Sequence, residues 1–145
     1  MRSFRDMNGT ERNISFTVGT FRKIKKELKL DLLSMDEKEL TNLMSDIISS
    51  VDILYIACET DLSAEDFAET LGGDSCEDGI FSMFEALADF FPRARRTTIH
   101  SIIKKTKALL TEAYTEATEK IDAIQLGDLL TEQQASSDTT ATDTR

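Results

Sequence analysis

The hydrophobic pattern of one stretch near the start of the chain changes its period within a few residues. This stretch is NGTERNISFTVGTFRKIKKELKLDLL, residues 8–33. In its first half, Ile14, Phe16 and Val18 alternate with polar residues, which is the period of a half-buried β-strand. From Thr20 onward the apolar residues recur at three- and four-residue steps, as on one face of a helix. The chain is therefore predicted to open with a β-hairpin and to continue in helices.

The hairpin is predicted to span about residues 3–18. Asn8-Gly9 is the dipeptide that a type I′ turn favours, because both central residues of that turn need a positive φ. A two-stranded hairpin is only marginally stable on its own in water. We therefore expect its apolar face to pack on the helical part of the chain.

The rest of the chain carries few residues that interrupt helices, with one Pro and six Gly among 145 residues. Four further helices are predicted from the hydrophobic period and from capping residues. The first begins at the capping-box pair Ser34 and Glu37 and ends at about Cys58, and the second begins at the N-cap Ser63 and ends at Gly72-Gly73. The third begins at Ser75 and ends at Pro92, and the fourth begins at about Arg95 and ends, after Ile124, at Gly127.

The predicted fold class is mainly α: a helical domain with a short N-terminal β-hairpin and a disordered C-terminal tail. Residues 1–130 form the predicted single domain, because a chain of this length can bury one core but not two. Residues 131–145 contain no apolar side chain larger than Ala. Such a segment cannot bury enough surface to order itself, so we predict a disordered polar tail there.

The net charge of −10 is unevenly distributed. Residues 31–92 carry sixteen acidic residues and one Lys, whereas residues 93–110 carry six basic residues and no acidic one. An acidic surface repels phosphate, so no nucleic-acid partner is expected. The basic segment is expected to pair with the acidic block inside the fold.

Other classes of protein are disfavoured by what the sequence lacks. No apolar run approaches the roughly 20 residues that a membrane span requires, so no membrane partner is expected. Cys58 and Cys76 form no Cys-x-x-Cys pair, which favours two reduced thiols over a disulfide or a zinc site. His100 is the only histidine, and the chain has neither a glycine-rich phosphate loop nor a Gly-x-Ser-x-Gly motif. We therefore predict no enzyme activity, no catalytic residue, no metal site and no cofactor.

Two alternative functions stay open at this point. Residues 74–85 match the spacing of a calcium-binding loop at its first, fifth, sixth and twelfth positions, which would indicate a calcium-responsive helical module. Against this reading, Cys76 supplies a soft sulfur at the third position, where calcium requires a hard oxygen. The acidic composition also allows an acidic adaptor protein.

Binding of a partner helix is the function that the aromatic residues favour. Four of the eight Phe residues lie within residues 81–91, and the neighbours Phe90 and Phe91 cannot both point the same way on one helix. An aromatic side chain that the core covers only in part can anchor an apolar partner helix. The candidate partner-binding residues are Phe84, Leu87, Phe90, Phe91, Ile99 and Ile103.

Four segments of the chain, taken in order, resemble the small tail assembly chaperones of long-tailed bacteriophages. They are residues 8–33 quoted above, DILYIACE (Asp52–Glu59), SAEDFAETLGGD (Ser63–Asp74) and EALADFFPRARR (Glu85–Arg96). Together the likeness covers about residues 5–110.

The resemblance implies a protein that binds another chain and carries out no chemistry. Such chaperones hold the long helical tape measure protein soluble in the host cytoplasm while the tail tube forms, and they are absent from the mature virion. The tape measure protein is therefore the expected partner, and the tail tube protein is a second candidate. A homo-oligomer is a further expectation, because a free hairpin edge can pair with another copy.

Overall fold

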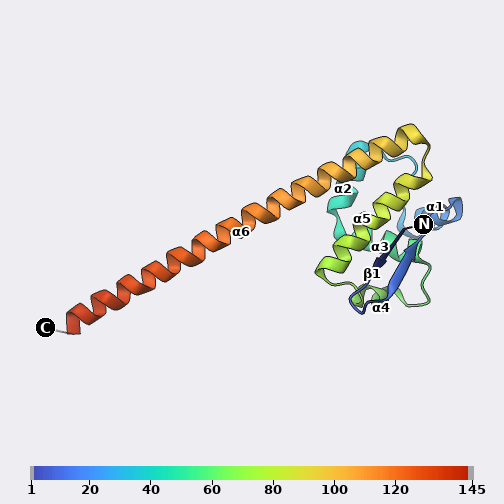
Figure 1. The fold of residues 1–145 in the computed structure, drawn as a ribbon. Helices are drawn as coiled ribbons and strands as arrows, with labels where there is room; N and C mark the ends of the chain where they lie inside the picture. The colour runs from blue at the N-terminus through green and yellow to red at the C-terminus, as the bar shows by residue number, and fades with distance from the viewer. Residues whose placement is uncertain (1, 144–145) are drawn as a thin grey trace. The chain divides into compact units, whose positions relative to one another are not determined.

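The computed structural model describes the backbone of residues 2–143 and the side chains of residues 2–124. The chain divides into two units, Met1–Thr106 and Lys107–Arg145. The sequence predicts one domain over residues 1–130. The fold is mainly helical with a short two-stranded hairpin at its N-terminus (Figure 1), which confirms the predicted fold class. The elements are β1 (Arg2–Arg5), β2 (Glu11–Ile14), α1 (Val18–Leu28), α2 (Glu37–Ser45), α3 (Ile47–Cys58), α4 (Ala64–Glu69), α5 (Gly73–Phe90) and α6 (Arg93–Asp143).

The hairpin is closed by a loop of residues 6–10 and not by a two-residue turn. β1 and β2 pair antiparallel, with Arg5 opposite Glu11. The carboxylate of Asp6 accepts hydrogen bonds from the backbone N–H groups of Asn8 at 2.9 Å and Thr10 at 3.0 Å. In the Asn8-Gly9 pair only Gly9 has a positive φ, of 79°. The predicted type I′ turn is therefore wrong, because the loop folds around the Asp6 carboxylate instead.

The second strand is shorter than the alternating pattern predicts. The hydroxyl of Thr17 accepts a hydrogen bond from the backbone N–H of Thr20, and the Thr20 hydroxyl accepts one from the N–H of Thr17. This reciprocal cap starts α1 at Val18, so β2 ends at Ile14. The predicted hairpin over residues 3–18 is therefore too long, and Val18 is an exposed first residue of a helix.

The predicted helix from the Ser34 region to Cys58 consists of two helices. α2 and α3 meet at Asp46 with a bend of 96°. Asp46 caps α3, since its carboxylate accepts hydrogen bonds from the backbone N–H and the hydroxyl of Ser49. Ile47 and Ile48, the first two residues of α3, are exposed to solvent.

The start of α2 also differs from the prediction. Its N-cap is Asp36, whose side chain accepts a hydrogen bond from the backbone N–H of Glu39 at 2.8 Å. The capping box predicted for Ser34 and Glu37 is therefore wrong, because an acidic side chain two residues later takes that role.

Among the described residues no single helix is long and apolar enough to cross a membrane, and α2 and α3 reach that length and composition only as a bent pair.

Residues 74–85, the possible calcium loop, lie inside one continuous helix. Ser63 caps α4 as predicted, but α5 begins at Gly73 rather than at Ser75. A helix does not wrap successive carboxylates around one ion as a calcium loop does. Within the part of the chain whose side chains are described, no group of three or more His, Cys, Asp or Glu residues could hold a metal ion.

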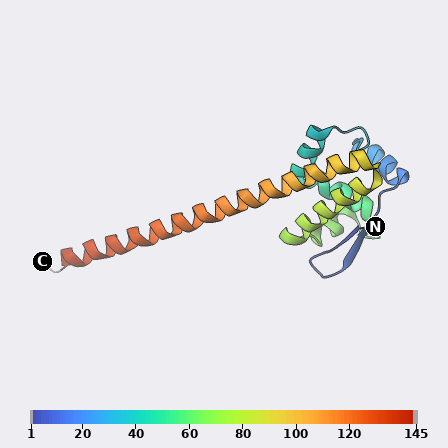
Figure 2. The same ribbon diagram turned by 45° about the horizontal axis from the view of Figure 1, so that its top comes forward.

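α5 packs against β1, β2 and α3 in the first unit. Figure 2 shows the hairpin beside this helix. A Cβ atom on Gly79 would lie 3.0 Å from Cδ2 of Leu54 in α3 and 3.0 Å from Cε2 of Phe4 in β1. Because Gly79 has no side chain, the hairpin and α3 can both approach the helix closely. The side chains of Leu54 in α3 and of Phe84 and Leu87 in α5 are fully buried.

α6 differs from the prediction at its C-terminal end. It continues through Gly127 to Asp143, so the prediction that it stops at Gly127 is wrong. A glycine inside a helix costs about 1 kcal/mol relative to alanine, which weakens a helix without ending it. The predicted disorder of residues 131–145 stays a prediction, because their side chains lie outside the described part of the chain.

Replacing Gly79 with valine should destabilise the protein by about 1–3 kcal/mol, because the new side chain would collide with Phe4 and Leu54 in a packed core. The matched control is Gly73→Val at the first position of α5, where a Cβ would meet nothing within 4 Å. The control should change the free energy of unfolding by less than about 0.5 kcal/mol. Urea unfolding followed by circular dichroism measures both, and equal losses would contradict the role given to Gly79.

Replacing Asp6 with asparagine should cost about 1–3 kcal/mol at neutral pH, because the buried carboxylate binds two backbone N–H groups and Arg12 at 3.1 Å. Burial alone would raise the pKa of Asp6, but the hydrogen bonds from Thr10 and Asn8 and the charge of Arg12 outweigh it and lower this pKa. A lowered pKa in the folded state means that Asp6 stabilises the fold above its unfolded pKa. This contribution is lost as the pH falls below about 4.

The variant should therefore lose less stability than the wild type as the pH falls below about 4. The control Asp31→Asn removes an exposed carboxylate 3.7 Å from Lys25 and should cost less than about 0.5 kcal/mol. Unfolding curves across this pH range test the prediction, which fails if Asp6→Asn shows the same acid dependence as the wild type.

Candidate functional site

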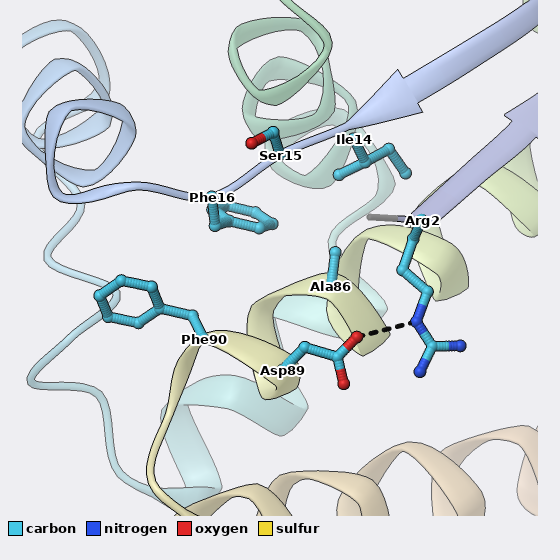
Figure 3. A pocket seen from close by; sticks show the side chains of 7 residues that line it. All are labelled: Arg2, Ile14, Ser15, Phe16, Ala86, Asp89 and Phe90. Atoms are coloured by element: carbon cyan, nitrogen blue, oxygen red, sulfur yellow. Dashed lines mark hydrogen bonds and ion pairs between the residues drawn. The ribbon is translucent and has the colours of Figure 1, made fainter.

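A hollow of about 290 Å³ lies between the hairpin and the C-terminal half of α5 in the first unit (Figure 3). Its volume is at the small end of the range of ligand sites, about 300–1,000 Å³. Four of its lining side chains are apolar, those of Ile14, Phe16, Ala86 and Phe90. Three are polar: Arg2 and Asp89 form an ion pair at one end, and Ser15 lies between Phe16 and Ile14. The hollow therefore offers an apolar wall beside a charged rim.

Phe16 and Phe90 form the aromatic end of the hollow. Phe16 lies in the linker after β2, which is held to α3 by a hydrogen bond from the backbone N–H of Ser15 to the carbonyl of Ala57 at 3.1 Å. The Phe16 ring stacks on Phe21 of α1 at 5.3 Å between centroids, and Phe21 meets Phe90 edge to face at 4.6 Å. Phe21 is buried, whereas Phe16 is half-buried and Phe90 is 36 % exposed. The cluster thus has a closed interior and an open edge.

Pro92 explains why Phe90 and Phe91 have different surroundings. The residue before a proline is restricted to extended backbone, and Phe91 has φ −83° and ψ 157°. The helix therefore ends at Phe90, and the side chain of Phe91 is buried. The Arg95 guanidinium lies 4.4 Å from the centroid of the Phe91 ring, which favours this position through a cation–π contact.

The polar rim is formed by two ion pairs of Arg2, near the start of the first unit, with Asp89 and Glu85 in α5. Nε of Arg2 lies 2.9 Å from Asp89 and its Nη1 lies 3.0 Å from Glu85. The hydrogen bond and charge of Arg2 lower the pKa of Asp89, with a smaller contribution from His100, whose Nε2 is 3.9 Å away. Asp89 is therefore ionised at neutral pH and neutralised in part by Arg2.

The expected pairing of the basic segment with the acidic block takes an unexpected form at two residues. Arg95 donates to the backbone carbonyl of Met35 at 2.9 Å, and Arg96 donates to the carbonyls of Asp89 and Phe91 at 3.2 Å each. These guanidinium groups thus satisfy free carbonyls in and near the acidic block, rather than carboxylates.

Of the six residues predicted to bind a partner, five are buried and one is accessible. Phe84, Leu87, Phe91, Ile99 and Ile103 all belong to the core. Their apolar period reflects packing inside the unit, so in this conformation they offer no surface to another chain. Phe90 lies at the rim of the hollow. It is therefore the one of the two neighbours, Phe90 and Phe91, that the core covers only in part.

The two cysteines lie outside the hollow. Both cysteines are free thiols, as predicted. Burial raises the pKa of the Cys58 thiol to about 12, and burial together with Glu77 raises the pKa of Cys76. A thiol with a raised pKa is a poor nucleophile at neutral pH.

The lining of the hollow suits an apolar side chain, which would pack against the two Phe rings with a polar neighbour at Arg2 and Asp89.

The sequence gives no local signal for most of this site. Arg2 and Asp89 are 87 positions apart, and nothing near either residue indicates their pairing. Phe16 follows the strand pattern, which placed it in the packed face of the hairpin. Phe90 alone could be identified, through its adjacency to Phe91 and Pro92.

No protein-family model, no curated protein and no solved structure matches this chain. The resemblance to tail assembly chaperones therefore stays a prediction that depends on the four quoted segments.

Alanine at Phe84 and at Phe90 should have different costs, although both lie on α5. Phe84→Ala should destabilise the protein by about 3–5 kcal/mol, because it empties a fully buried site. Phe90→Ala should cost about 1–2 kcal/mol, since this residue is already 36 % exposed and its ring contacts with Phe21 and Phe91 are lost. Chemical unfolding measures both variants, and an equal cost would show that Phe90 is a core residue.

Proposed function

We propose that this chain is a non-enzymatic tail assembly chaperone, which binds the tape measure protein of its phage and keeps it soluble during tail tube assembly. The host cytoplasm is the proposed place of action, and the mature virion would lack the protein. The observation that carries the proposal is the exposed edge of the Phe16–Phe21–Phe90 cluster beside the hollow. An accessible aromatic edge at a rigid helix end is a suitable anchor for an apolar side chain of a client.

The form of the hollow supports a helical client. Peptide helices bind to grooves through apolar side chains at i, i+3, i+4 and i+7. One such side chain would lie between Phe16 and Phe90, and the next turn of the client would lie near Arg2 and Asp89 (Figure 3). A basic residue on that turn would meet Asp89 and Glu85 on the rim.

The charge of the chain supports a client with basic flanks. The chain carries 27 acidic and 17 basic residues, and the acidic excess lies in residues 31–92. Complementary charge raises association rates and disfavours acidic competitors. It also keeps the chaperone itself soluble while it exposes apolar side chains.

The direct test is co-expression of the tape measure protein with this chain. We expect the soluble fraction of the tape measure protein to rise several-fold, and to fall back when Phe90→Ser is used. The matched control is Ile48→Ser, which removes another exposed apolar side chain that is not part of the hollow. The control should act like the wild type.

The outcomes separate the function from its site. If the tape measure protein is equally insoluble with and without the chain, the chaperone function is wrong. If the wild type solubilises it and Phe90→Ser does so equally well, the function stands and the hollow is not the binding site. Thermal unfolding of both serine variants confirms that each is folded at the expression temperature.

A further inference from the structure

A second apolar surface lies on α6 between Lys107 and Ile124, in the second unit. No residue of this segment is buried, and four of its large apolar side chains are more than half exposed: Leu109, Tyr114, Ile121 and Ile124. Contiguous exposed apolar surface on a protein marks an interaction site. Helices also gain most of their stability by packing an apolar face against other elements. The apolar face of this segment has no such packing within its own unit.

The apolar residues of this segment follow the spacing of a coiled coil. Leu110, Tyr114, Ala117, Ile121 and Ile124 are separated by alternating steps of four and three. This is the a/d period of two helices that pack side by side over several turns. Leu109 falls outside this seam, about a quarter turn away from Leu110 on the helix.

We propose that the partner of this seam is the same seam of a second copy of the chain, in antiparallel orientation. With the two-fold axis between residues 115 and 116, Leu110 of one copy faces Ile121 of the other, and Tyr114 faces Ala117. The largest seam residue thus lies opposite the smallest, which is the arrangement that fills space between helices. Each pairing holds twice, because the axis exchanges the two copies. The fifth seam residue, Ile124, lies opposite Lys107 of the other copy at each end of the contact.

The charges of the segment favour a second copy over a different partner. The positions that flank the seam are Thr111, Ala113, Thr118 and Lys120, so only one of them is charged. In the antiparallel pair Thr111 lies near Thr118 and Ala113 lies near Lys120, and no like charges meet. The acidic residues Glu112, Glu116, Glu119 and Asp122 lie off the seam, where they remain in water. A partner selected by opposite charge would need charged flanks, and Lys120 is the only charged residue among these four.

The seam is short, so the dimer should be weak and concentration-dependent, with a dissociation constant of order micromolar. Sedimentation equilibrium of the full chain measures it. Ile121→Asp should weaken the dimer at least tenfold, because each copy would place a charge in the apolar seam. Leu109→Asp is the matched control, since Leu109 is somewhat more exposed than Ile121 but lies off the seam, and it should leave the constant unchanged.

Disulfide trapping tests the orientation in a chain whose own cysteines are replaced with alanine. A mixture of the Tyr114→Cys and Ala117→Cys variants should form the mixed disulfide faster than either variant alone forms its own. A strict monomer up to about 100 µM overturns the proposal, as does an equal effect of Leu109→Asp and Ile121→Asp. Preferential linkage of Tyr114→Cys to itself overturns the antiparallel arrangement. None of these substitutions touches the hollow, so the result is independent of the chaperone test.

Discussion

The close approach of three elements at Gly79 is the contact on which the first unit depends. A bare backbone at this point of α5 admits Phe4 from the hairpin on one side and Leu54 from α3 on the other. The hairpin, which could not persist alone, thereby becomes part of the core. The same docking brings Ile14 and Phe16 opposite Ala86 and Phe90, so the hollow is a direct result of it.

The secondary structure was predictable where one periodic signal dominates. The hairpin and the helical class follow from the change of period in residues 8–33, and Ser63 was correctly identified as a cap. Two of the errors occur where a side chain binds the backbone next to a periodic segment. Thr17 ends the strand and Asp46 divides a helix, and in both cases the apolar period continues across the break. Periodicity reports which faces are apolar, and it does not report where the backbone changes direction.

The candidate site was predictable only in part, because periodicity selects core residues. Phe84, Leu87, Ile99 and Ile103 repeat at helical spacing, and such residues pack against their own unit first. The accessible residue, Phe90, was suggested by a local irregularity, namely two adjacent Phe residues before a proline. The ion pair of Arg2 with Asp89 required the complete fold, since the two residues come together only through the docking of β1 on α5.

The helix α6 shows the same limit of periodicity, here for an exposed apolar face rather than a buried one. Isoleucines at 99, 102 and 103 are buried, whereas the apolar residues from Leu109 to Ile124 are accessible or half-buried. The sequence pattern is continuous across this change, because a helix uses one apolar period for its own core and for a foreign partner. The two cases differ in burial alone: Ile99, Ile102 and Ile103 belong to the core of the first unit, whereas no residue between Lys107 and Ile124 is buried. A chain that works by binding would therefore place its docking surfaces where the apolar pattern extends beyond the elements of its own core.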